Sequence, residues 1–73
     1  MRMFRPPRSR FGERLEERGI KQSEVVEKSG VAHQTISNLA SGKTHRPTRL
    51  NDRKIRKALR EIDPELERED LWD

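Results

Sequence analysis

The chain has 73 residues, of which 29% are apolar and 41% charged, with a net charge of +4 and no cysteine. A chain of this length holds one domain, and so few apolar residues suit short packed helices better than a β-sandwich or a barrel. The lack of cysteine excludes a disulfide framework and a small domain held together by zinc. The lack of a long apolar run excludes a transmembrane helix and a secretory signal. We therefore expect an all-α, cytoplasmic protein with no metal site and no membrane segment.

Charge is distributed unevenly along the sequence. Residues 61–73 carry seven acids and one base, whereas residues 1–60 carry 16 bases and six acids. Basic segments attract polyanions, and the excess of arginine over lysine, 12 against 5, favours forked contacts to phosphate or guanine. The basic part of the chain is therefore where a polyanion is expected to bind.

The first segments are an arm and a short helix. Residues 1–8 contain paired prolines and three arginines without a periodic apolar face, which predicts an extended basic arm. From Ser9, a candidate N-cap, the spacing of Phe11 and Leu15 predicts a first amphipathic helix that ends near Gly19.

Two further short helices are predicted over 22–29 and roughly 32–40, separated by a tight turn. Gly30 is expected to close the earlier helix in a left-handed conformation. In the later helix, Ile36 and Leu39 recur on one face, so that the opposite, polar face is expected to project outward.

A fourth helix is predicted over about 49–61 after a loop over residues 41–47. Thr48 is its candidate N-cap, and the proline that ends the loop disfavours helix in the residue before it. The apolar stripe expected to face the core is Leu50, Ile55, Ala58, Leu59 and Ile62.

The acidic segment 63–73 predicts a short terminal helix. Residues 63–65 combine an N-cap acid, a proline at the first helical position and a further acid. Its apolar residues, Leu66, Leu71 and Trp72, can form the lid of the monomer core or a dimer surface. A large aromatic side chain such as Trp72 is expected to be packed against another surface and not left in solvent. We favour a homodimer contact as that surface.

The stretch from 20 to 42 joins two short helices through the turn, and a projecting helix of this width fits the major groove of B-DNA. Its marks are the Gln22-x-x-x-Val26-x-x-x-Gly30-Val31 spacing, the Thr35-Ile36-Ser37-x-Leu39 helix and the 41–47 loop. With these marks the chain resembles, over about 11–66, the lambda repressor/Cro-type helix-turn-helix regulators. The resemblance implies a compact five-helix fold, a DNA-binding domain over 9–62, double-stranded operator DNA as partner, and no cofactor.

The resemblance also implies roles for individual residues. The side chains that read base edges are His33, Gln34, Ser37 and Asn38. Gln and Asn amides suit this work because they pair with adenine bidentately. The groups that contact phosphates are Gln22, Ser41, Lys43, Thr44, Arg46 and Arg49. The arm is either a solubilising tail or a groove-tracking segment, and as the latter it would contact DNA through Arg5, Arg8 and Arg10.

We therefore predict a sequence-specific transcription regulator of phage or bacterial origin, a Cro-like repressor that binds operator DNA as a homodimer and blocks promoters. One alternative is an antitoxin or adaptor that holds a protein partner through the fourth or the terminal helix. Another is an RNA binder, although the chain has few stacking aromatics. An enzyme is not expected, because the sequence has no Gly-rich phosphate loop, no nucleophile–base pair and no metal-ligand spacing.

Overall fold

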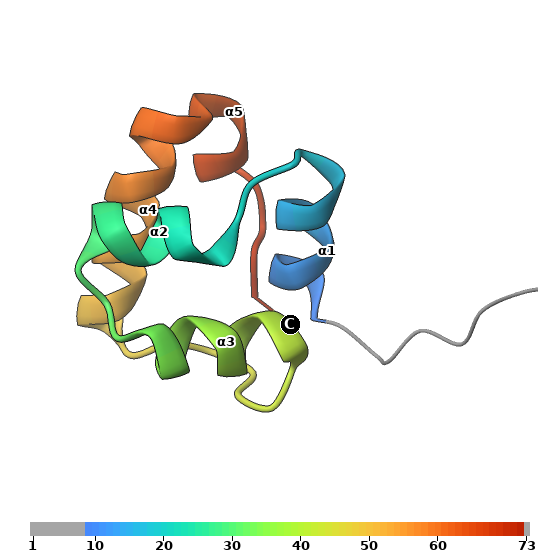
Figure 1. Ribbon diagram of the computed structural model, residues 1–73, viewed down its shortest axis with the longest axis vertical. Coiled ribbons are helices and arrows are strands. Elements are labelled where there is room, and N and C mark those ends of the chain that lie inside the picture. Colours follow the sequence, from blue (N-terminus) through green and yellow to red (C-terminus); the bar gives the residue numbers. More distant parts are fainter. Residues whose placement is uncertain (1–8, 73) are drawn as a thin grey trace, which may run out of the picture.

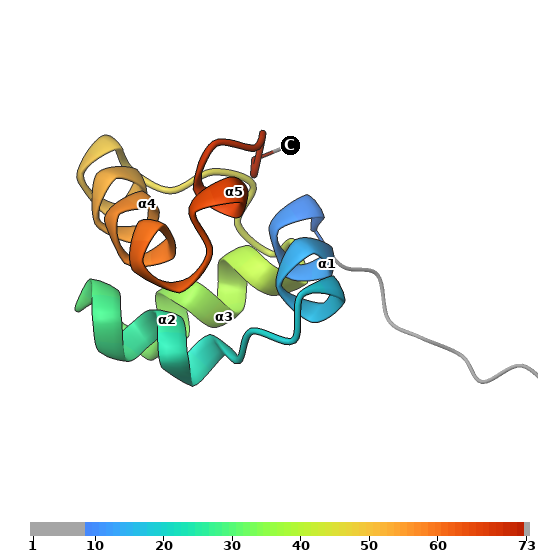
Figure 2. The same ribbon diagram turned by 90° about the horizontal axis from the view of Figure 1, so that it is seen from above.

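The computed structural model describes residues 9–72, and these form five α-helices without a strand (Figure 1). The helices are α1 (Arg10–Glu17), α2 (Gln22–Ser29), α3 (His33–Ser41), α4 (Arg49–Ile62) and α5 (Pro64–Glu67). Viewed from above, α4 and α5 lie on one side of the molecule, α2 and α3 on the other, and α1 closes one end (Figure 2). The expected all-α, five-helix fold is confirmed.

The helix starts follow from side-chain caps where the sequence provides them. Ser9, Thr48 and Asp63 each have extended backbone and accept hydrogen bonds from first-turn N–H groups of α1, α4 and α5. Lys21 and Ala32, which precede α2 and α3, provide no such bond. Those two helices are therefore held by packing rather than by their caps.

The start of α1 is joined directly to the end of α3. Ser9 is buried, with only 5% of its surface exposed, and its Oγ accepts the N–H of Gly12 at 3.0 Å. The same hydroxyl lies within donating distance of the carbonyl oxygens of Leu39 and Ala40, and the Ser9 N–H donates to the Ala40 carbonyl at 3.2 Å. One serine thus satisfies orphan groups at two helix ends.

All described segments share one hydrophobic core. Its fully buried large side chains are Phe11, Val25, Ile36, Leu39, Ile55, Leu59, Leu66 and Leu71. Two of them follow residue 62, so the acidic segment is part of the same packed unit. The core closes around the inward faces of all five helices that the structure describes.

The terminal apolar residues complete this core from within one chain. Leu66 and Leu71 are 0% exposed, which places both in the lid of the monomer core and leaves no surface for a second copy. The Trp72 ring lies 5.0 Å from the Phe11 ring, and its Nε1 donates to Asp52 Oδ1 at 2.7 Å. The cover that Trp72 requires is thus supplied by its own chain.

Two details differ from the sequence prediction. Leu50 is 60% exposed rather than part of the core stripe, because at 100° per residue it lies opposite Leu59 on α4. The terminal helix ends at Glu67, so Leu71 and Trp72 follow it without helical structure. The Glu67 carbonyl oxygen accepts from Arg56 Nη1 at 2.6 Å and is not left for a further helical turn.

Gly12→Ala is expected to destabilise the fold. In most helix interiors this change stabilises by about 1 kcal/mol, but a Cβ at residue 12 would lie 2.1 Å from the Ala40 carbonyl oxygen. We expect a net loss of roughly 1–3 kcal/mol in the free energy of unfolding, typical of overpacking. Urea unfolding followed by Trp72 fluorescence measures it. Glu17→Ala, on the exposed side of α1, is the control and should change stability by less than about 0.5 kcal/mol. A Gly12→Ala protein as stable as the parent would contradict the close approach.

Candidate nucleic-acid interface

The turn between α2 and α3 fixes the direction of α3. Gly30 adopts a left-handed backbone with φ of 76°, which ends α2, and its N–H donates to the Val26 carbonyl. Val31 is buried, and its N–H donates to Ser29 Oγ at 3.1 Å. Together with the buried Ile36 on α3, these contacts hold one side of α3 against the core and leave the other outside.

The outward face of α3 carries the polar side chains predicted to read bases. His33 and Gln34 are exposed, and Ser37 and Asn38 are half-buried. Gln34 Nε2 donates to Asn38 Oδ1 at 2.9 Å, so the two amides are held as a pair. This pair keeps the Asn38 amide N–H groups as donors and the Gln34 carbonyl oxygen as an acceptor, which complements the acceptor and donor that adenine shows in the major groove.

The loop after α3 folds back onto the end of that helix. Gly42 has φ of 90°, and the Thr44 N–H donates to the Asn38 carbonyl oxygen at 3.1 Å. Ser41 Oγ donates to the same carbonyl at 3.3 Å and accepts from the Lys43 N–H at 3.4 Å. The side chains of Lys43, Thr44 and Arg46 are therefore exposed directly beside the α3 face.

Two short helices, a left-handed glycine between them and an exposed second helix form the arrangement of a helix-turn-helix. A family model described as Helix-turn-helix matches residues 12–66, well over half of the chain. The chain belongs to the lambda repressor/Cro-type helix-turn-helix family. It is accordingly a DNA-binding transcription regulator, from a family that is not enzymatic. No curated protein and no solved structure matches the chain significantly.

The other residues predicted to meet the phosphates of DNA lie at helix starts in this helix-turn-helix protein. Gln22 is the half-buried first residue of α2, and Arg49 is the exposed first residue of α4. Because Lys21 offers no capping side chain, the N–H groups of Gln22 and Ser23 keep the donors that helix starts present to anions, whereas the Glu24 N–H donates to the Lys21 carbonyl oxygen. The geometry is thus compatible with both assignments.

Of the three arginines predicted to contact DNA from the arm, only Arg10 belongs to the described residues. Arg5 and Arg8 lie outside the described residues. Arg10 is the first residue of α1, and its Nη1 lies 2.7 Å from Asp70 Oδ2. Its guanidinium is therefore engaged by the acidic segment of its own chain.

The pairing of α1 with the acidic segment was not predicted from the sequence. Arg14 Nη1 lies 3.1 Å from Glu69 Oε1, Arg18 Nη1 lies 2.9 Å from Asp63 Oδ2, and Arg18 Nη2 also bonds Glu69. The available signal was the spacing of arginines at 10, 14 and 18, which places all three on one face of a helix. The acidic segment thus neutralises α1 and not the α3 side of this regulator.

Most of the basic side chains that stay unpaired in the described part of the chain lie on the loop after α3 and on α4, the others being Lys21, Lys28 and Arg68. Among residues 9–72, five basic side chains there make no hydrogen bond or ion pair: Lys43, Arg49, Arg53, Lys54 and Lys57. In the same part of the chain, no helix is long and apolar enough to cross a membrane, and no group of three or more His, Asp or Glu could hold a metal ion. The site is therefore a polar helix face bordered by free cations.

The Arg18–Asp63 pair raises the pKa of Arg18 and lowers the pKa of Asp63. Burial works to raise the pKa of Asp63, but the hydrogen bonds from Arg18 and from the Leu66 and Glu65 N–H groups outweigh it, and the net pKa lies below its ordinary value. The hydrogen bond with Asp63 is the main cause that raises the pKa of Arg18. Since the folded pKa of Asp63 is depressed, its contribution to stability is present at neutral pH and lost as pH falls through that pKa.

Asp63→Asn tests this linkage, because the Asn side chain keeps an oxygen for the α5 cap and removes only the charge. The substituted protein should be less stable than the parent at pH 7, and the difference should shrink as pH falls below about 4. Urea unfolding at pH 7, 5, 4 and 3 measures it. Glu61→Gln, at an exposed α4 residue without a partner among the described residues, is the control. A pH-independent difference for Asp63→Asn would show that the charge is not stabilising.

Proposed function

We propose that this protein is a sequence-specific repressor that binds double-stranded operator DNA with α3 in the major groove. The observation that carries the proposal is the amide pair of Gln34 and Asn38, which lies on the outward face of α3, opposite the buried Ile36 and Leu39. An α-helix fits the major groove, where all four base pairs can be distinguished. The pair supplies direct readout of an adenine, and His33 and Ser37 extend the same face.

Phosphate contacts position the protein on the duplex. The backbone of the loop after α3 is fixed by its bonds to the Asn38 carbonyl oxygen, so Ser41, Lys43, Thr44 and Arg46 form a rigid edge beside the readout face. Gln22 and Arg49 extend this edge from the starts of α2 and α4. Such contacts hold the register of the protein and make its affinity depend on salt.

The regulatory mechanism that fits is steric exclusion. A bound protein occupies the promoter and prevents polymerase from using it, as in a Cro-like phage or bacterial repressor acting in the cytoplasm. We further propose that two copies bind a two-fold symmetric operator, because one α3 covers only a few base pairs and a pair of half-sites about 34 Å apart doubles the contacts. Since Leu66 and Leu71 are buried within one chain, their surface is not the proposed dimer contact.

Asn38→Ala should relax the choice of base at one or two positions of each half-site. Each good bidentate contact is worth about 1–3 kcal/mol, so the preference there should fall by roughly ten-fold or more. Selection of binding sites from a random duplex pool measures it. Asn51→Ala, the same substitution on α4, should leave the selected motif unchanged. If Asn38→Ala returns the parental motif, Asn38 does not read a base.

Lys43→Ala should weaken binding to all duplexes alike. Removing one phosphate contact should lower the slope of log affinity against log salt by about 1. Anisotropy of a labelled duplex at several salt concentrations gives the slope. Arg68→Ala removes one charge at the C-cap of α5, a helix that lies on the other side of the molecule from α3 (Figure 2), and should leave the slope as it is. Equal slopes for the parent and Lys43→Ala would remove Lys43 from the DNA contacts.

A further inference from the structure

The outward face of α4 carries a stripe of side chains that the DNA-binding function does not use. Residues 50, 53, 57 and 60 lie within about one quarter of the helix circumference, since each residue turns by 100°. They are Leu50, Arg53, Lys57 and Arg60, here called the α4 stripe. Leu50 is the exposed large hydrophobic residue of the described chain, and Arg53 and Lys57 have no partner within it.

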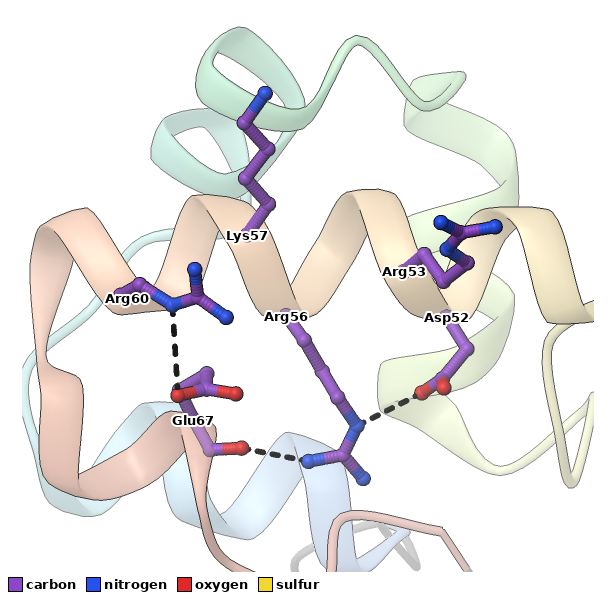
Figure 3. A pocket seen from close by; sticks show the side chains of 6 residues that line it. All are labelled: Asp52, Arg53, Arg56, Lys57, Arg60 and Glu67. Atoms are coloured by element: carbon purple, nitrogen blue, oxygen red, sulfur yellow. Dashed lines mark hydrogen bonds and ion pairs between the residues drawn. The ribbon is translucent and has the colours of Figure 1, made fainter.

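The surface beside the stripe is hollowed along most of α4. A hollow of about 520 Å³ is lined by Arg49, Leu50, Asp52 and Arg53. A second, of about 320 Å³, is lined by Asp52, Arg53, Arg56, Lys57, Arg60 and Glu67 (Figure 3). Asp52 and Arg53 line both, so the two hollows are neighbours on α4, and together they are here called the furrow. One has the apolar side chain of Leu50 in its wall, and the other lies among cations.

The wall of this furrow is held rigidly. Arg56 Nε lies 3.0 Å from Asp52 Oδ1, and its Nη1 donates to the carbonyl oxygens of Glu67 at 2.6 Å and Glu69 at 3.2 Å. Figure 3 shows this guanidinium reaching across from α4 to Glu67 at the end of α5, while Arg53 and Lys57 extend away from it. Arg60 Nε lies 3.7 Å from Glu67 Oε1, and the Arg60 side chain is 68% exposed. Arg56 is therefore structural, and the stripe cations stay available.

The stripe points to an occupant other than the duplex on α3. In Figure 1, α4 begins near α3 and runs away from it toward α5, against which it packs. A straight duplex held by α3 therefore lies at the start of α4 and leaves the rest uncovered. A second copy docked stripe to stripe would bring Arg53 and Lys57 of both chains together, and like charges in contact are unfavourable.

We propose that the α4 stripe docks a short acidic segment of a partner protein, with one apolar side chain seated against Leu50. Carboxylates of the segment would meet Arg53, Lys57 and Arg60, which supply the complementary potential that steers and orients a charged partner. From Leu50 to Arg60 α4 rises about 15 Å, which matches roughly five residues of extended chain. This proposal does not depend on whether the protein represses or activates transcription.

The test is an NMR titration of the full chain, labelled with ¹⁵N, with the peptide Leu-Glu-Asp-Glu-Glu and with its neutral counterpart Leu-Gln-Asn-Gln-Gln. The acidic peptide should shift amide resonances of residues 49–60, and the neutral peptide should bind at least about five-fold more weakly. Arg53→Glu combined with Lys57→Glu should weaken binding of the acidic peptide by roughly ten-fold or more, and Leu50→Ala by about three-fold.

Matched controls separate docking from general attraction between charges. Lys21→Glu combined with Lys28→Glu makes the same change of net charge at exposed residues of another element, α2, and should alter binding by less than about two-fold. A saturating duplex selected from a random pool should leave the peptide shifts on residues 53–60 in place. Shifts confined to α3 and the 42–48 loop, equal weakening by both double substitutions, or no shift at millimolar peptide would each overturn the proposal. Failure of duplex selection itself would bear on the proposed function and not on the stripe.

Discussion

The direction of the polar face of α3 depends on a contact made on the other side of that helix. Ser9 and Gly12, at the start of α1, bring that helix against the backbone of Leu39 and Ala40 at the end of α3. Only glycine fits at position 12, because a Cβ there would meet the Ala40 carbonyl oxygen. The Gly30 turn fixes the opposite end of α3. With both ends fixed, the amide pair of Gln34 and Asn38 has a defined direction relative to the core, and preorganised readout requires this.

The acidic segment contributes to the protein both by burying leucine side chains and by forming ion pairs, and these two contributions to stability differ in size. Burial of a leucine side chain contributes roughly 1.5–3 kcal/mol, whereas an ion pair near the surface contributes about 0–1 kcal/mol. Leu66 and Leu71 therefore account for most of the stability that this segment adds, and its carboxylates chiefly decide where charge remains. By pairing with Arg10, Arg14 and Arg18 they remove the free positive charge of α1, so that most of what remains lies on the α3 loop and α4. The buried leucines of this segment thus stabilise the fold, and its ion pairs set the distribution of charge on the surface.

Local signals in the sequence predicted most of the fold. Capping residues at 9, 48 and 63 and glycines at 30 and 42 mark helix ends by short-range chemistry, so the helix bounds followed from a few neighbouring residues. The features that were missed depend on residues far apart in the chain. Arg10 meets Asp70 across 60 positions, and Arg56 ends α5 from the neighbouring helix. Leu50 was misplaced because an apolar residue was assumed to face inward, although its angle on α4 is outward. The family match supports the predicted DNA-binding role, whereas base and phosphate assignments rest on the outward direction of α3.

The separation of the two faces has an energetic consequence. The amide pair lies on α3 and the α4 stripe runs away from it along a helix that Arg56 ties to α5, so a segment bound to Arg53, Lys57 and Arg60 would not have to displace a duplex held by α3. An acidic protein alone is repelled by DNA phosphates. Seated on the α4 stripe, it lies beside cations instead, and a bound partner is held near the operator at an effective concentration that can reach the millimolar range. With both proposals in place, a weak contact on α4 would be sufficient to hold an acidic protein beside the DNA, because DNA binding by α3 would supply the localisation.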